Sequence, residues 1–323
     1  MINDRQQGIA LLIVMWALAA LMVIVLAFSY MARIETKTTT AFIEGAEERF
    51  MAEAGINMAV AEIAYRKMTL GTPLEPGKEY EVWYTDGTPN VFGLEKATCL
   101  VRITDESGKV DLNKTPDIII KGLLLNLGVK DEDADIIVDS LQDWRDPDDL
   151  VRLHGAEDDY YMSLPSHYKP KNADFESIEE LLLVRGVTTE LFYGTAGTPG
   201  LADFVTVYSE SGKINLGAAP KEVLMAVPGM TPELAAAIIE FRKAVTANNA
   251  QAIQGIIGQA NAAMAPFIIS GDSNTFTVEA AGRKSPDKPG YGIKAVVSLN
   301  GSKFIYRYFR SPWDMTKWKQ PEK

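Results

Sequence analysis

The sequence has few of the side chains that usually carry catalysis or covalent crosslinks. It contains one cysteine, Cys99, in 323 residues, which excludes an intrachain disulfide and a zinc site built from two or four cysteines. The two histidines, His154 and His167, leave little scope for histidine-based metal or acid–base chemistry. We therefore expect no catalytic residues, and the protein is predicted not to be an enzyme.

Basic residues are scarce relative to acidic ones. There are 32 lysines and arginines against 43 aspartates and glutamates, which gives a formal charge of −11. Proteins that bind nucleic acid neutralise phosphates with clustered lysine and arginine, so no nucleic-acid partner is expected. The acidic excess is local, because the segment from Asp131 to Asp159 holds twelve acidic residues and two arginines and carries −10 by itself.

One long stretch near the N-terminus has no charge at all. After the polar segment MINDRQQG, the 24 residues from Ile9 to Ala32 contain no charged side chain. At about 1.5 Å per residue, such a helix crosses a hydrocarbon core of roughly 30 Å. The pattern predicts a single transmembrane helix, and the flanking charges do not fix its orientation. An ordinary uncleaved signal anchor is the alternative at this point.

The predicted helix continues beyond the membrane as an amphipathic stem that ends near Met68. An apolar stripe recurs at spacings of three and four, which is typical of one face of a helix. Its members are Phe42, Ala46, Phe50, Ala54, Met58, Ala61 and Tyr65. We expect this stripe to be the core face of a helix lying on a sheet, and any part left uncovered to be a partner-binding surface.

Strand patterns occur in two groups that are far apart in the sequence. Alternating apolar residues predict strands at 80–84, 99–103, 276–280, 293–299 and 304–309. Asn300-Gly301 between the last two is a strong signal for a type I′ hairpin. Between the groups the apolar period becomes helical, which indicates an inserted helical domain.

These patterns predict an α+β fold in which the stem helix packs on one antiparallel sheet that is interrupted by the helical insertion. The predicted segments are a leader at 1–8, the transmembrane helix at 9–32, the stem helix at 33–70, the sheet at 71–112 and 273–311, the helical domain at 113–272 and a tail at 312–323.

The insertion contains internal repeats. The segment 106–113 (ESGKVDLN) recurs as 210–217 (ESGKINLG), and three glycine turns, at Gly128, Gly186 and Gly229, resemble helix-hairpin-helix units. Such units often bind DNA through a Gly-x-Gly turn at a helix N-terminus, so a membrane-anchored DNA receptor is the alternative function. In all three turns the second glycine is missing, which favours a structural role.

The densest chemistry lies in the acidic segment. Asp143, Asp146 and Asp148 have only Arg145 and Arg152 as nearby cations, and all-oxygen clusters of this kind suit Ca²⁺. The spacing is not that of an EF-hand, and a solvated acidic loop is the alternative. Nothing in the sequence places two carboxylates across a cleft as in a glycosidase.

The N-terminal order of segments, a short polar leader that ends in Gln-Gly followed at once by an apolar helix, resembles the type IV prepilin class. There, a prepilin peptidase cuts before the apolar helix, which implies cleavage between Gly8 and Ile9 and methylation of the new N-terminus. Most members have Glu at the fifth mature position, where this sequence has Ile13. The minor pseudopilin at the tip of the type II secretion pseudopilus is the subclass that lacks it.

The acidic segment makes the resemblance more specific. The motifs DWRDPD (143–148), GAED (155–158), YKPKN (168–172), EELLLVRG (179–186) and SGKINLGAAP (211–220) resemble those of the general secretion pathway protein K family, which are minor pseudopilins of type II secretion. The resemblance implies a pseudopilin sheet with an inserted helical domain that binds structural calcium. The ligand roles carry over to Asp143, Asp146, Asp148, Glu157 and Asn172.

The resemblance also implies the function. We expect a non-enzymatic minor pseudopilin at the pseudopilus tip, which initiates assembly for protein export across the outer membrane. Its expected partners are the other minor pseudopilins, the major pseudopilin, prepilin peptidase and the inner-membrane secretion platform. The expected location is the bacterial inner membrane, with one span and a periplasmic C-terminal domain.

Overall fold

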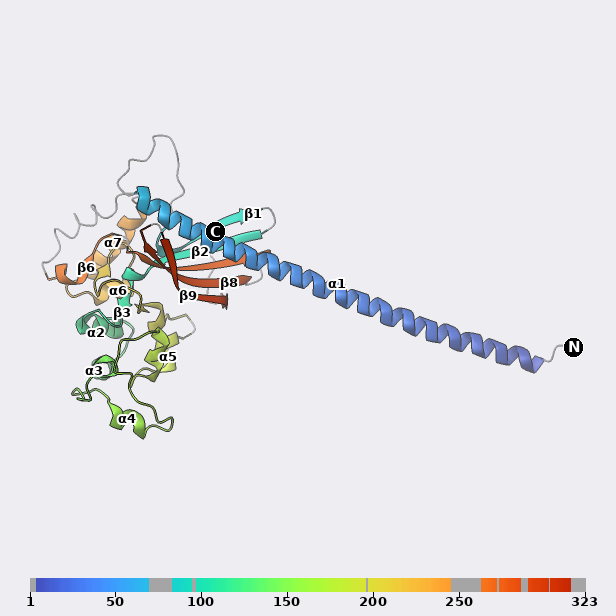
Figure 1. Cartoon of the computed structure of the whole chain (residues 1–323), viewed down its shortest axis with the longest axis horizontal. Coiled ribbons are helices and arrows are strands. Elements are labelled where there is room, and N and C mark those ends of the chain that lie inside the picture. The colour runs from blue at the N-terminus through green and yellow to red at the C-terminus, as the bar shows by residue number, and fades with distance from the viewer. Residues whose placement is uncertain are drawn as a thin grey trace.

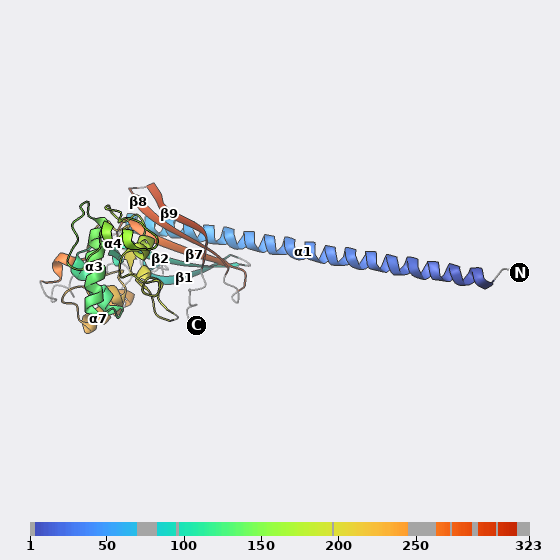
Figure 2. The same cartoon turned by 90° about the horizontal axis from the view of Figure 1, so that it is seen from below.

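The computed structural model describes residues 4–69, 83–94, 97–195, 197–244, 263–271, 273–285, 290–301 and 303–314. A long helix runs from the N-terminal end to a sheet, and a group of short helices branches from the sheet (Figure 1). The view from below shows that the helix lies along one side of the sheet (Figure 2).

Helix α1 (Asp4–Thr69) is 66 residues long. Its first part projects away from the rest of the chain, and the side chains from 11 to 43 are all exposed (Figure 1). An 18-residue window within Leu11–Met68 has a mean hydropathy of 3.0 and is not buried, so length and composition allow α1 to cross a membrane. The predicted span at 9–32 therefore lies in the projecting part.

The sheet has five strands in the order β1-β2-β7-β8-β9, and every neighbouring pair is antiparallel. The strands are β1 (Asp86–Leu94), β2 (Ala97–Asp105), β7 (Thr275–Arg283), β8 (Tyr291–Asn300) and β9 (Lys303–Trp313). Helix α1 packs on β2, β7 and β8. The predicted α+β fold class is confirmed.

The last two strands form the predicted hairpin, with its turn one residue later than expected. Asn300 pairs with Lys303, so Asn300 belongs to the strand. Gly301 has φ +61°, a left-handed conformation that glycine adopts at little cost.

The first strand in the described part of the chain follows the predicted strand at 80–84, most of which lies outside the described residues. Tyr80 and Val82 lie outside the described residues, and Tyr84 precedes β1. Trp83 is buried in the sheet core, where its ring stacks on Phe92 with centroids 6.0 Å apart. The segment DGTPNVFGL lacks a strong strand pattern, but β1 is an edge strand, where a proline is tolerated.

The face of α1 that packs on the sheet is not the predicted stripe, and that expectation is wrong. Phe42 and Phe50 are 78% and 67% exposed, whereas Ile56 and Ile63 are each 2% exposed. Burial of each of these isoleucines contributes about 1.5–3 kcal/mol. The buried face of the stem consists of Met51, Ala52, Ile56, Ala59, Val60 and Ile63.

Small residues explain the choice of face. A Cβ on Gly55 would lie 2.6 Å from the Cys99 Sγ, and one on Gly282 of β7 would collide with the Glu48 carbonyl oxygen of α1. The two backbones therefore approach closely along this line. Cys99 is buried there, and burial raises its pKa to about 12, so it acts as a small apolar residue.

The helical insertion leaves the sheet after β2 and returns at β7. Its helices are α2 (Asp117–Asn126), α3 (Asp131–Arg145), α4 (Asp158–Ser163), α5 (Thr189–Tyr193), α6 (Lys221–Ala226) and α7 (Pro232–Ala244). Single 3-10 turns are η1 (Glu106–Gly108), η2 (Ile178–Leu183), η3 (Leu201–Asp203) and η4 (Ala265–Phe267). Its two-residue strands pair in parallel, β3 (Val110–Asp111) with β4 (Val205–Thr206) and β5 (Ile214–Asn215) with β6 (Ile268–Ile269).

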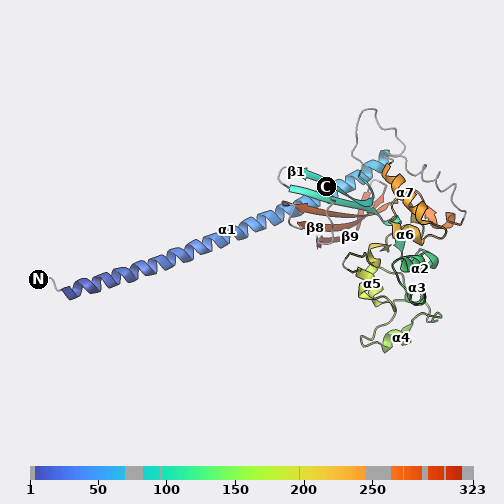
Figure 3. The ribbon, with the colours of Figure 1, turned by 180° about the vertical axis from the view of Figure 1, so that it is seen from behind.

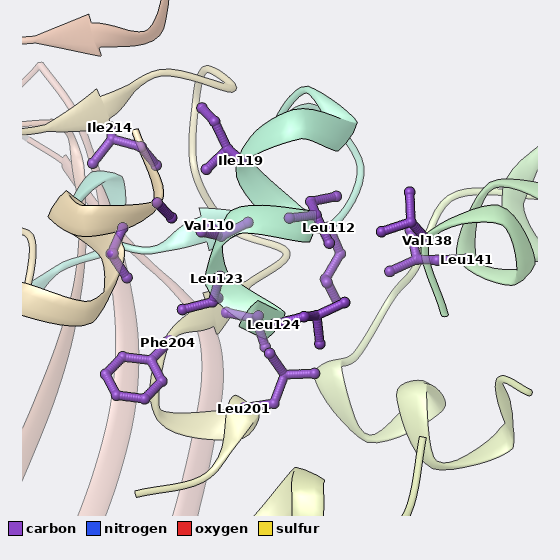
Figure 4. Close-up of a cluster of buried hydrophobic side chains, with 14 of the residues drawn as sticks. Val110, Leu112, Ile119, Leu123, Leu124, Val138, Leu141, Leu201, Phe204 and Ile214 are labelled. Carbon is purple, nitrogen blue, oxygen red and sulfur yellow. The ribbon is translucent and has the colours of Figure 1, made fainter. Parts of the chain in front are cut away.

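The insertion has its own hydrophobic core. Side chains from β3, α2, α3 and η3 converge around Leu112, Leu123, Leu124, Leu141 and Leu201 (Figure 4). This core is separate from the cluster between α1 and the sheet. The insertion therefore buries apolar surface independently of the stem.

The repeats occupy equivalent positions. The Asp111 carboxylate accepts the Asn113 N–H at 2.9 Å, and the Asn215 amide oxygen accepts the Gly217 N–H at 3.0 Å. Gly128, Gly186 and Gly229 have φ of +86°, +88° and +87°, and each turn joins two helical segments.

Candidate functional site

The predicted site lies at the end of the insertion farthest from α1. The views from the front and from behind both place α3 and α4 at this end (Figures 1 and 3). The site is formed by the C-terminus of α3, the loop from Asp146 to Glu157 and Asn172.

Proline ends α3 and starts the loop. Pro147 disfavours helical backbone at the residue before it, and Asp146 is extended with φ −77° and ψ 154°. The loop then folds back onto Asp143, whose Oδ2 accepts the Arg152 N–H at 3.1 Å. Gly155 packs so tightly on this carboxylate that a Cβ would collide with it.

Five oxygens of the site are buried without a hydrogen-bond partner. They are Asp143 Oδ1, Asp146 Oδ1, both carboxylate oxygens of Glu157, and Asn172 Oδ1. Asp143 is fully buried and Glu157 is 6% exposed. Because unpaired buried oxygens are costly, this set fits a cation that supplies the missing partner. Oxygen donors of carboxylate and amide type suit Ca²⁺.

The raised pKa values of the buried carboxyl groups indicate that the site has too little positive charge to balance its carboxylates. Burial, together with the nearby Asp143, Asp146, Asp149 and Asp148, raises the pKa of Glu157 to about 7. Burial also raises the pKa of Asp143, against the lowering effect of Arg152. The arrangement thus disfavours the ionised carboxylates that a bound cation would stabilise.

Asn172 reaches the site through a left-handed backbone conformation, with φ +48°. Its N–H donates to the Trp144 carbonyl oxygen at 2.9 Å, and its Nδ2 donates to Asp149 Oδ1 at 3.4 Å. These two bonds orient the side chain. Asparagine tolerates this conformation better than most residues, which explains its presence here.

Four of the five residues named from the sequence, Asp143, Asp146, Glu157 and Asn172, have a buried side-chain oxygen without a hydrogen-bond partner. Asp148 differs, because it is exposed and its Oδ1 accepts the Leu150 N–H at 2.9 Å. Within the described ranges, no three Asp, Glu, His or Cys side chains are already gathered closely enough to hold a metal ion. Ion binding at this site would therefore draw the side chains together and use the Asn172 oxygen.

Sequence reasoning noted Arg152 only as a nearby cation and Gly155 only as part of a motif, and it missed their contacts with the Asp143 carboxylate. The Arg152 Nε lies 3.3 Å from Asp143 Oδ1, and one of its Nη atoms donates to Asp146 Oδ2 at 2.9 Å. The available signal was that Arg152 is the lone cation of the loop. The two histidines lie aside: the exposed His154 donates its N–H to Asp139, and the His167 ring contacts the Met162 carbonyl.

Aromatic rings form a rigid support beneath the site. The Trp144 ring contacts those of Tyr161 and Phe175, with centroids 5.4 Å and 6.5 Å apart. Arg185 of the middle glycine turn donates to the Gly155 carbonyl oxygen at 2.8 Å and lies over the Tyr160 ring. The turn at Gly186 itself packs on Ile137 of α3. This turn therefore braces the loop.

A second candidate surface is the open face of α1. We call it the stem face, and it consists of the exposed apolar residues Phe42, Ile43, Phe50, Met58, Tyr65 and Met68. The sheet covers the opposite side of the helix, so Phe42, Phe50 and Met58 point away from the protein's own core, whereas Met68 lies near Leu299 and Phe304 at the end of the sheet. Large exposed apolar patches mark interaction sites.

Comparisons with known proteins agree on one family. Residues 98–209 match the family model described as type II secretion system (T2SS), protein K. The chain is 31% identical over 173 residues to the type II secretion system protein K of Pseudomonas aeruginosa, covering 50% of this chain and 49% of the relative. It is 26% identical over 208 residues to that of Pectobacterium carotovorum, covering 59% and 61%. The matches therefore span about half to three-fifths of these relatives.

A solved structure has the same fold. The match is to the GspK-GspI-GspJ complex from the enterotoxigenic Escherichia coli type 2 secretion system, with a TM-score of 0.62 and 16% identity. It covers 86% of this chain and 99% of the matched chain.

Proposed function

The chain belongs to the type II secretion system protein K family, and we propose that it acts as a minor pseudopilin of a type II secretion pseudopilus. The observation that carries this proposal is the stem face. One side of α1 is buried on the sheet, while the opposite side presents large apolar residues to solvent. A helix of this kind is built to pack against other helices.

We propose that the partners on the stem face are the other minor pseudopilins. The solved relative was captured in a complex with two such proteins, GspI and GspJ, which supports an assembly of the same kind here. The projecting apolar part of α1 would hold the chain in the inner membrane and later pack within the pseudopilus. The C-terminal domain would lie in the periplasm.

The proposed position in the pseudopilus is its tip, where the protein would initiate assembly for export across the outer membrane. The insertion branches away from the sheet and would obstruct lateral packing along a fibre (Figure 3). Ile13 also removes a carboxylate that could pair with the N-terminal amine of a subunit above. Both features suit a subunit with nothing stacked on it, followed below by the major pseudopilin and the inner-membrane platform.

Processing is part of the same proposal. Prepilin peptidase would cleave between Gly8 and Ile9, and the new N-terminus would be methylated. Mass spectrometry of the protein isolated from its native membrane tests this step. A mature N-terminus at Ile9 supports the proposal, whereas an intact Met1 would return the chain to the class of plain signal anchors.

We further propose that the buried acidic site binds a structural Ca²⁺. Asp143, Asp146, Glu157 and Asn172 would hold the ion through their unpartnered oxygens, with Asp148 at the rim. The ion would neutralise the carboxylates and tie the end of α3 to the loop and to the Asn172 segment. Thermal unfolding of the full chain in detergent, with calcium and with chelator, should show stabilisation by calcium. Identical melting temperatures with calcium and with chelator would contradict the calcium site and favour the alternative of a solvated acidic loop.

Partner binding is tested with a matched pair of variants. Phe50→Ser on the stem face should reduce co-elution with the minor pseudopilins encoded beside this protein, because it removes an apolar contact. Leu153→Ser is the control, since Leu153 is an apolar residue that is even more exposed, at 89% against 67% for Phe50, and it lies in the insertion and not on α1. Equal binding by both variants would contradict the assignment of the stem face.

A further inference from the structure

Among the described residues, Arg152 is the cation that contacts the Asp143 and Asp146 carboxylates of the acidic site. Its Nε lies 3.3 Å from Asp143 Oδ1 and an Nη lies 2.9 Å from Asp146 Oδ2. Its own N–H donates to Asp143 Oδ2, which anchors the residue by its backbone as well. Arg152 thus contacts both oxygens of a fully buried carboxylate and one oxygen of its neighbour.

This arrangement differs from an ordinary surface ion pair. Asp143 has no exposure, and its charge would be unfavourable without a cation nearby. The Arg152 side chain is 43% exposed, so it approaches the carboxylates from the solvent side. Asp146 Oδ1, both Glu157 oxygens and Asn172 Oδ1 remain unpartnered on the inner side. The site therefore has one cation at its outer edge and enough oxygens without a hydrogen-bond partner to bind a second cation.

We propose that Arg152 is the built-in counter-cation of the site, and that it and a bound divalent ion compete to neutralise the same carboxylates. This inference rests on the proposed calcium site. Arg152 holds the loop folded before any ion arrives, because Asp143 and Asp146 already have a cationic partner. The same positive charge repels the incoming ion, so it lowers the affinity of the site.

Two substitutions separate charge from shape. Arg152→Gln removes the charge, and Arg152→Lys retains it while losing the planar fork of donors. Without ion, Arg152→Gln should melt at a lower temperature than wild type, and Arg152→Lys should stay close to wild type. In calorimetric titrations, Arg152→Gln should bind calcium roughly tenfold more tightly, because removal of a partly exposed charge beside a divalent ion relieves a repulsion of that order.

The experiment uses the full chain in detergent micelles, with chelator for the ion-free melts and CaCl₂ as the titrant. The calcium-induced rise in melting temperature should be larger for Arg152→Gln than for wild type, because the ion replaces the missing counter-charge. Weaker calcium binding by Arg152→Gln, or equal behaviour of the Gln and Lys variants, would overturn the proposal and assign Arg152 an orienting role instead.

Failure of the calcium site gives a different result from failure of this inference. If wild type shows neither heat nor a calcium-dependent shift in melting, the proposed calcium site is wrong. The counter-cation role is then decided by the chelator melts alone. A loss of stability in Arg152→Gln but not in Arg152→Lys supports it, and equal melting of all three proteins refutes it.

Discussion

The unpaired carboxylate of Glu157 gives the sharpest prediction. Glu157→Gln should stabilise the protein without calcium and destabilise it, relative to wild type, with calcium. Burial and four neighbouring aspartates raise the pKa of Glu157 from 4.5 to about 7. Below about pH 4.5 the carboxyl is protonated in both the folded and the unfolded state, so it does not make the free energy of unfolding depend on pH. Between pH 4.5 and 7 the unfolded state loses the proton first, so stability falls as the pH rises.

The size of the effect follows from the shift. A displacement from 4.5 to about 7 corresponds to about 3 kcal/mol of lost stability above pH 7 in the ion-free protein. Glu157→Gln removes the charge and keeps the shape, although its amide remains poorly paired. We therefore expect the variant to be more stable than wild type by about 1–3 kcal/mol at pH 8 with chelator, or roughly 3–10 °C in melting temperature.

Calcium should reverse the order of stability, so that wild type becomes more stable than Glu157→Gln. Wild type gains stability from a ligand that only its folded state binds, whereas Glu157→Gln lacks an anionic oxygen pair and gains less. The assay is thermal unfolding of the full chain in detergent at pH 5 and pH 8, each with chelator and with calcium. At pH 5 the two proteins should melt closer together than at pH 8.

A control separates the buried carboxylate from general acidity. Asp159→Asn removes one charge from the exposed side of the same segment and should have little effect under any of these conditions. The reasoning is refuted if Glu157→Gln lowers the melting temperature at pH 8 in chelator, since the ionised carboxylate would then be favourable to the fold.

Three further substitutions test the packing that positions the two surfaces. Gly155→Ala should lower the melting temperature and weaken calcium binding in a titration, because its methyl group collides with the Asp143 carboxylate. Gly282→Ala should cost about 2 kcal/mol or more in denaturant unfolding, since the new Cβ meets the Glu48 carbonyl oxygen of α1. Ile63→Ala should cost about 2–4 kcal/mol by the same measurement, because Ile63 is 2% exposed between helix and sheet.

The architecture was largely predictable because its signals are long or repeated. An uncharged run of 24 residues, two groups of alternating strands and a change of period between them suffice for a helix, a sheet and an insertion. The hairpin at Gly301 was also predictable, since few residues adopt its backbone conformation. Strand β1 was not predictable, because the segment DGTPNVFGL has no clear alternation of apolar residues and is held as a strand by its pairing with β2.

The face of α1 was predicted wrongly for a physical reason. The stripe with Phe42, Phe50 and Tyr65 carries the large aromatic side chains, and burial of these side chains on the sheet was the natural expectation. The structure buries the face that carries Gly55 and Ala59 instead, because small residues allow α1 to approach β2 and β7 closely. Hydrophobic period shows that a helix has an apolar face, but it does not distinguish a face for the protein's own core from one for a partner.

The acidic site shows a related difference between composition and geometry. Spacing placed Asp143, Asp146 and Asp148 together as equals, but only the first two have a buried oxygen without a hydrogen-bond partner. The remaining oxygens come from Glu157 and from Asn172, which the chain delivers through a left-handed turn and two hydrogen bonds. Arg152 then approaches the same carboxylates from solvent. An acidic segment favours a bound cation only where the fold buries more carboxylate oxygens than its own cations can pair, and here both carboxylate oxygens of Glu157 are buried without a hydrogen-bond partner.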